Sequence, residues 1–152
     1  MTCAGNLQMV FSSYYMQPVD VVVDKMIQCE LSDSDKKMSN PPIVVYDREV
    51  DMFIGDSMFC KATCKVKVYD DELYEALETQ DVGIGQLLRL RNLGPLFSLH
   101  DAGRSNDGGM WRFYSMDCKG IVDFDIVEEF SGDAWDMKQM TSVISSEEHP
   151  TL

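Results

Sequence analysis

The chain has 152 residues, enough for one domain with a full hydrophobic core and too few for two. Its hydrophobic content of 45% is ordinary for a soluble globular protein, and no apolar run approaches a membrane span or a signal peptide. A formal charge of −13 argues against nucleic acid and anionic membranes as partners, because both select basic patches. We therefore expect a cytoplasmic protein with neither partner.

The cysteines and histidines are too few and too scattered to predict a metal site. Five cysteines stand at positions 3, 29, 60, 64 and 118, and the two histidines are His100 and His149. No convincing set of four ligands can be drawn from them. We expect reduced thiols that are buried as small hydrophobic side chains, and no bound metal.

The N-terminal region predicts a short helix and then a strand. Asn6 can cap a helix whose apolar residues recur at helical spacing, namely Leu7, Val10, Phe11 and Tyr14, with Met9 and Met16 widening that face. Pro18 opens a strand over Val19–Cys29, in which Val19, Val21, Val23 and Ile27 share one side. The polar segment Leu31–Pro42 is expected to be a solvated loop.

A hairpin over Ile43–Tyr69 is the clearest element of the sequence. In its first strand every second residue is apolar except Arg48, and the second strand alternates apolar residues with lysine or threonine. A three-residue loop at Gly55–Ser57 places Arg48 opposite Cys64 and Met52 opposite Cys60. The same register matches two opposite-charge pairs on the other face, Asp51 with Lys61 and Asp47 with Lys65.

Arg48 is therefore predicted to point into the protein. Burying an unpaired guanidinium costs several kcal/mol in order of magnitude, so Arg48 needs an acidic partner or a bound anion. The alternatives are an arginine that extends to solvent at a sheet edge and an arginine in a structural ion pair.

Two short helices are expected after the hairpin. Asp70-Asp71-Glu72 supplies acidic residues for the start of a helix over Leu73–Glu78. A second helix, Gln86–Asn92, ends at Gly94-Pro95. Its glycine-flanked start leaves the backbone N–H groups of Ile84 and Gly85 free, which suits an anion, although most helix starts bind water or a cap.

The remainder predicts a strand and a second hairpin. Leu96–Asp101, which carries His100, reads as a strand, and the glycine-rich loop Gly103–Gly109 lacks the spacing of a phosphate-binding loop. Met110–Cys118 and Ile121–Phe130 then form a hairpin around Lys119-Gly120.

The last strand repeats the anomaly of Arg48, because Glu128 is the one charge on its apolar face. A two-residue turn at Lys119-Gly120 would place Trp111 opposite Glu128, and burial beside a tryptophan raises the pKa of a carboxyl group. Two interpretations remain open: a structural pair of Arg48 with Glu128, or a site with an anion-binding arginine and a protonatable glutamate.

The order of five short motifs resembles the chorismate lyase-like family. They are Gly5-Asn6-Leu7-Gln8, Pro18-Val19, Asp47-Arg48-Glu49-Val50, Ile84-Gly85-Gln86, and the strand pair with Trp111-Arg112 and Val127-Glu128-Glu129-Phe130. The resemblance spans about residues 5–131, so we expect a domain over residues 1–131. The composition after it, rich in Ser, Thr and Glu from Thr141 to Leu152, predicts an acidic tail over 132–152. The resemblance implies an α+β fold: a single antiparallel sheet of about six strands, with helices on one face enclosing a ligand cavity.

The resemblance also implies roles for individual residues. Arg48 matches an arginine that grips a ligand carboxylate, Ile84 a position whose backbone amide touches the ligand, and Glu128 the glutamate of the site. We also expect ligand contacts from Gly85, Trp111 and Met9. Arg112 matches a basic position near the site, but the predicted register turns it outward, and a bulge would exchange Glu128 with Glu129.

The expected function is that of a cofactor-free enzyme acting on a small, carboxylated, cyclic organic acid. As a true lyase it would remove enolpyruvate from chorismate, leaving a hydroxybenzoate and pyruvate, with Glu128 donating a proton to the departing ether oxygen. A natural-product tailoring isomerase, cyclase or dehydratase could use the same pocket on a polyketide-like acid. A non-catalytic ligand-binding module is the alternative from another class.

Overall fold

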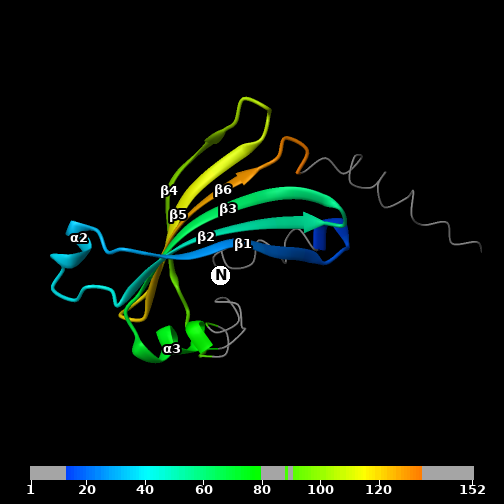
Figure 1. Cartoon of the computed structure of the whole chain (residues 1–152). Coiled ribbons are helices and arrows are strands. Elements are labelled where there is room, and N and C mark those ends of the chain that lie inside the picture. The colour runs from blue at the N-terminus through cyan, green and yellow to red at the C-terminus, as the bar shows by residue number, and fades with distance from the viewer. Residues whose placement is uncertain (1–12, 80–87, 89–90, 135–152) are drawn as a thin grey trace, which may run out of the picture.

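The computed structural model describes residues 13–79, 88 and 91–134 of the chain. These residues form one six-stranded antiparallel sheet in the order β1-β2-β3-β6-β5-β4, with few helices (Figure 1). The strands are β1 (Val19–Cys29), β2 (Val44–Ile54), β3 (Ser57–Val68), β4 (Leu96–Arg104), β5 (Met110–Cys118) and β6 (Val122–Phe130). The short helix α2 spans Asp33–Lys36, and α3 spans Asp71–Thr79.

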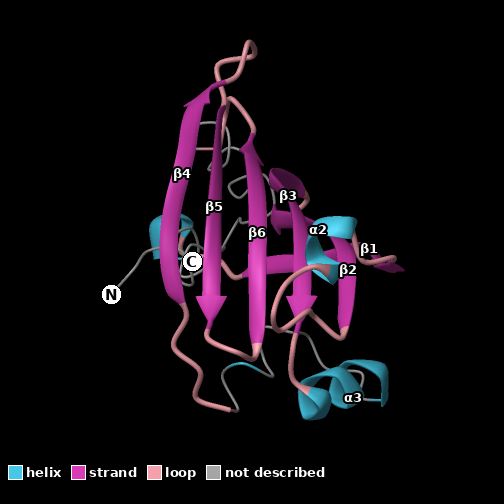
Figure 2. Cartoon of the chain, turned by 90° about the vertical axis from the view of Figure 1, so that its left-hand side faces the viewer, coloured by secondary structure: helices cyan, strands magenta, loops and turns pink. Residues whose placement is uncertain are grey.

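The sheet consists of two three-stranded halves that meet between β3 and β6. Each half is a meander of consecutive strands, and the two are joined by antiparallel pairing from Cys60↔Phe130 to Val68↔Val122. Figure 1 shows the halves diverging from a common end, β1–β3 in one direction and β4–β6 in another, as expected of a strongly twisted sheet. Figure 2 shows α3 beyond the lower end of the strands.

The β2–β3 hairpin has the predicted register. Arg48 lies opposite Cys64, Met52 opposite Cys60, Asp51 opposite Lys61 and Asp47 opposite Lys65. The connection differs in detail, because Ile54 pairs with Ser57 and an irregularity between Met52 and Phe53 supplies the extra residue. Gly55 has a φ of 58°, a left-handed conformation that suits this turn.

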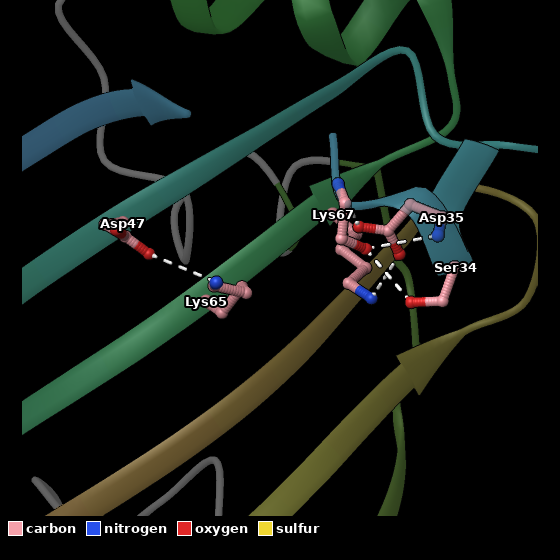
Figure 3. A network of polar contacts seen from close by, with 6 residues as sticks. Ser34, Asp35, Asp47, Lys65 and Lys67 are labelled. Carbon is pink, nitrogen blue, oxygen red and sulfur yellow. Dashed lines mark hydrogen bonds and ion pairs between the residues drawn. The ribbon is translucent and has the colours of Figure 1, made fainter. Parts of the chain in front are cut away.

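The outer face carries Lys61, Lys65 and Lys67 of β3, and two of these lysines form ion pairs. Figure 3 shows Lys65 reaching Asp47 of β2, with Nζ and Oδ1 3.8 Å apart, and Lys67 reaching Asp35 of α2 at 2.7 Å. The first pair is about half exposed and therefore contributes little stability. The second is more buried and fixes α2 against the sheet.

The segment predicted as a solvated loop contains α2, so that prediction is partly wrong. The Ser32 hydroxyl accepts a hydrogen bond from the Asp35 N–H at 3.1 Å, and the Ser32 N–H donates to Asp35 Oδ2 at 3.3 Å. This reciprocal capping box makes one helical turn within a polar segment. The hydrogen bond from Lys67 lowers the pKa of the buried Asp35 carboxyl group.

The inner face is the opposite side of the sheet, to which Arg48 and Glu128 belong. Its main core joins alternate residues of β2, β3, β5 and β6 to Leu73 of α3. The Tyr46 hydroxyl of β2 donates to Glu78 Oε1 at 2.6 Å, which ties the end of α3 to the sheet. Of the cysteines, Cys29, Cys60, Cys64 and Cys118 lie in the described ranges and are free thiols.

Strand β1 has the predicted bounds, but its faces differ because of a bulge at Asp24. Before the bulge Val19, Val21 and Val23 lie opposite Ile54, Met52 and Val50. After it Met26 lies opposite Arg48, whereas Ile27 lies opposite Asp47 and shares the outer face with it. The prediction that Ile27 shares a side with the valines is therefore wrong.

Candidate ligand site on the inner face

Glu128 lies on the inner face, as predicted, but its neighbour on β5 is not the predicted one. The turn between β5 and β6 contains three residues, Lys119–Ile121, since Cys118 pairs with Val122. Arg112 therefore lies opposite Glu128, and Trp111 lies opposite Glu129. The predicted two-residue turn and the pairing of Trp111 with Glu128 are wrong by one residue.

Trp111 is on the outer face and packs against β4. A Cβ atom added to Gly103 would come within 2.9 Å of the Trp111 ring, so the indole lies directly over this glycine. Glu129 shares the outer face and is exposed, which identifies Glu128 as the inward carboxylate. The predicted tryptophan environment of Glu128 is therefore absent.

Glu128 forms a closed cluster with two residues of β5. Arg112 Nε donates to Oε2 at 2.6 Å, and the Tyr114 hydroxyl donates to Oε1 at 2.6 Å. The Arg112 guanidinium also lies over the Tyr114 ring, 4.6 Å from its centroid. Glu128 is 3% exposed, and Arg112 points inward, contrary to the prediction.

Within this Arg112–Tyr114–Glu128 cluster, burial and the charge of Glu128 shift the pKa values of Tyr114 and Arg112. Burial raises the pKa of Tyr114, and the charge of Glu128 raises it further, so the hydroxyl keeps its proton at neutral pH. Burial alone would lower the pKa of Arg112, but the hydrogen bond and charge of Glu128 outweigh it and raise that pKa. One nitrogen of Arg112, Nη2, is buried and has no hydrogen-bond partner within the ranges that the structure describes.

Arg48 does not take part in this cluster. It is partly buried on β2, between Met26 of β1 and Cys64 of β3. Burial lowers the pKa of Arg48, and within the described ranges no carboxylate lies within ion-pair distance of it. The predicted alternative of an Arg48–Glu128 pair is wrong, because Glu128 is neutralised by Arg112.

The pairing of the strands places Arg48 and Tyr114 in one cross-strand row. The row runs from Arg48 through Cys64 and Ile126 to Tyr114. At the usual spacing of strands, the ends of this row are roughly 14 Å apart. Cys64 and Ile126 between them are buried, and burial raises the pKa of the Cys64 thiol to about 12. Arg48, which has no ion-pair partner among the described residues, thus lies at one end of an apolar row, and Tyr114 with its hydrogen-bonded Glu128 lies at the other.

Three of the predicted ligand contacts, Met9, Ile84 and Gly85, lie outside the described residues and stay predictions. Sequence reasoning missed Tyr114 and the inward direction of Arg112. Strand β5 carries large apolar side chains on both faces, so its sequence pattern does not predict which face points inward. The available signal was electrostatic: a three-residue turn would have paired the lone inward glutamate with an arginine.

The described residues also line a cavity of about 420 Å³ beside the β4–β5 loop, and this cavity is partly open to solvent. Neither Arg48 nor Glu128 lines it.

None of the described helices is long and apolar enough to cross a membrane. Compared with models of known protein families and with curated proteins, the chain matches no family model and no curated protein.

Proposed function

We propose that the protein is a cofactor-independent enzyme that binds a small, carboxylated, cyclic organic acid on the inner face. The observation that carries the proposal is Arg48, a partly buried cation on an apolar face with no carboxylate partner in the described ranges. A ligand carboxylate would supply the missing counter-charge through a bidentate pair. Helices over the inner face would close the ligand cavity, as in the chorismate lyase-like fold that the sequence resembles.

The reaction to test first is elimination of enolpyruvate from chorismate. The ether C–O bond to the ring breaks, the ring loses one proton and becomes aromatic, and the leaving enolpyruvate takes a proton and becomes pyruvate. Arg48 holds a carboxylate, and Glu128 transfers the proton. Because both Glu128 oxygens accept hydrogen bonds, Glu128 would act first as an acceptor of the ring proton and then pass that proton to the leaving enolpyruvate, while the Tyr114 hydroxyl keeps its own proton.

An isomerase, cyclase or dehydratase acting on a polyketide-like acid would use the same groups. It also needs one arginine for a carboxylate, one acid–base residue and an apolar floor. Such an enzyme would bind benzoate-type acids without releasing pyruvate from chorismate.

A non-catalytic binding module is the second candidate, and the geometry of Glu128 favours it. Both oxygens of this carboxylate are already hydrogen-bonded within the protein. The Arg112–Tyr114–Glu128 cluster could then serve packing alone, and Arg48 would be the group that contacts the ligand.

The test is incubation with chorismate in the absence of added metal and nucleotide. The proposal predicts pyruvate in a one-to-one ratio with a hydroxybenzoate, and loss of both products with Arg48→Met. The control is Lys65→Met, which removes an exposed cation from the outer face. If the folded protein binds chorismate and releases no pyruvate, the lyase proposal fails and the tailoring or binding-module function takes its place.

A further inference from the structure

The cavity beside the loop that joins β4 to β5 has walls made largely of backbone. It lies between the β4–β5 loop and the chain that follows β6, and four of its eight lining residues are glycines. A Cβ atom on Gly132 would come within 2.6 Å of the Asp107 carbonyl oxygen, so these two segments meet closely. Its volume of about 420 Å³ is in the range of small-molecule sites.

Two side chains give this cavity a chemical character. Arg104, an exposed residue, lines its open side, and in the part of the chain that the structure describes no carboxylate lies within ion-pair distance of its guanidinium. Ser131 also lines it, and its buried hydroxyl has no hydrogen-bond partner among the described residues. Because that hydroxyl has no partner to lose, rotation about χ1 toward the cavity costs no hydrogen bond.

The acidic side chain of the β4–β5 loop does not compete for this arginine. Asp107 in the β4–β5 loop accepts a hydrogen bond from the Gly109 N–H at 3.0 Å, which holds its carboxylate to its own loop. The cavity therefore presents one cation and one potential hydroxyl donor among small, uncharged walls. A small oxyanion matches both groups.

We propose that this cavity is a second binding site, which takes a small molecule bearing a carboxylate or phosphate group. Arg104 supplies the charge, Ser131 donates a hydrogen bond, and Ala102 and Met110 contact the rest of the molecule. The site is separate from the one proposed at Arg48, which does not line the cavity.

The experiment is a titration of the full chain with inorganic phosphate and, separately, with benzoate, followed by the amide NMR signals of Gly108, Gly109 and Gly132. We expect saturable shifts of these signals with at least one probe, and the better probe identifies the anion. Arg104→Gln should weaken binding about tenfold or more, because a charge-assisted hydrogen bond is lost. Ser131→Ala should weaken it less, and Ala102→Leu should abolish it by filling the cavity.

The control is Lys119→Gln, which removes the same charge at the opposite end of β5 and should leave the affinity unchanged. Arg48→Met should also leave these glycine shifts unchanged, so a failure of the enzyme proposal would not affect this one. Absence of shifts with both probes, or an Arg104→Gln variant that binds as tightly as the parent, would overturn the proposal.

Discussion

Glu128 is the residue whose environment is most fully specified, with one hydrogen bond to each oxygen. We expect Glu128→Gln to abolish turnover, because an amide cannot take up a proton in the reaction. The variant should also be less stable, since its amide group faces Arg112 without a negative charge; a loss of about 2 kcal/mol is expected. Activity assays and thermal melts of the same samples separate the two effects.

The matched control is Glu129→Gln, the same change on the adjacent, exposed residue of the outer face. It should leave both turnover and melting temperature near those of the parent. A larger loss of activity at position 129 than at 128 would contradict the assignment of the inward carboxylate.

The pairing of Glu128 with Arg112 makes a second prediction at this scale. In a double-mutant cycle, Arg112→Met and Glu128→Gln should be coupled by about 2–4 kcal/mol in the free energy of unfolding, because each single change strands a buried polar partner. Arg48→Met and Glu128→Gln should be additive to within about 0.5 kcal/mol, since no ion pair joins them. Denaturant unfolding of the variants measures both couplings, and strong coupling to Arg48 would contradict the described cluster.

At the scale of elements, the two hairpins show when a register can be predicted. In β2–β3 the alternation is unambiguous, and the pairs Asp51–Lys61 and Asp47–Lys65 agree with it. In β5–β6 the alternation of β5 is uninformative, because Trp111 and Phe113 on one face are as apolar as Tyr114 and Met116 on the other. The register of β5 against β6 then depends on the length of the turn between them. Gly120, with a φ of 73°, permits the three-residue turn.

The β5–β6 hairpin also brings two like charges together, Asp117 opposite Asp123. Burial raises the pKa of Asp123 to about 6, and a hydrogen bond with Asp117 contributes to the rise. The pKa of this carboxyl group is 3.8 in the unfolded state and about 6 in the folded state. Between these two pH values the folded state therefore binds more protons than the unfolded state. Stability from this group is present at low pH and is lost as the pH rises through 6.

Replacing Asp117 by Asn should accordingly raise stability at pH 7.5, by about 1 kcal/mol after allowance for solvent screening. It should also flatten the fall in stability between pH 4 and 6. Thermal melts across this pH range measure both effects, with Asp20→Asn on β1 as an exposed control. An unchanged pH slope would show that the two carboxylates do not share a proton.

At the scale of the whole molecule, the decisive contact is the pairing of β3 with β6. It places Arg48 and Glu128, far apart in the sequence, on one face of one sheet. Their inward direction was predictable because each is the lone charge on an apolar strand face. Their mutual position was not, because local alternation contains no information on which strands of the two halves meet. Glu128, which the sequence suggested as a partner of Arg48, therefore pairs with Arg112 instead.

The central claim is that Arg48 binds a carboxylate on the inner face. The measurement is the melting temperature with and without benzoate, for Arg48→Met, for the outer-face control Lys65→Met and for the parent. All three proteins, the parent included, carry Arg104→Gln, so that benzoate bound in the cavity beside the β4–β5 loop does not contribute to the melting temperature. At about tenfold excess over its dissociation constant, benzoate should stabilise the protein by about 1.4 kcal/mol, or roughly 3 °C. We expect this rise in the parent and in Lys65→Met and none in Arg48→Met. No rise in the parent, or an equal rise in Arg48→Met, would contradict the central claim.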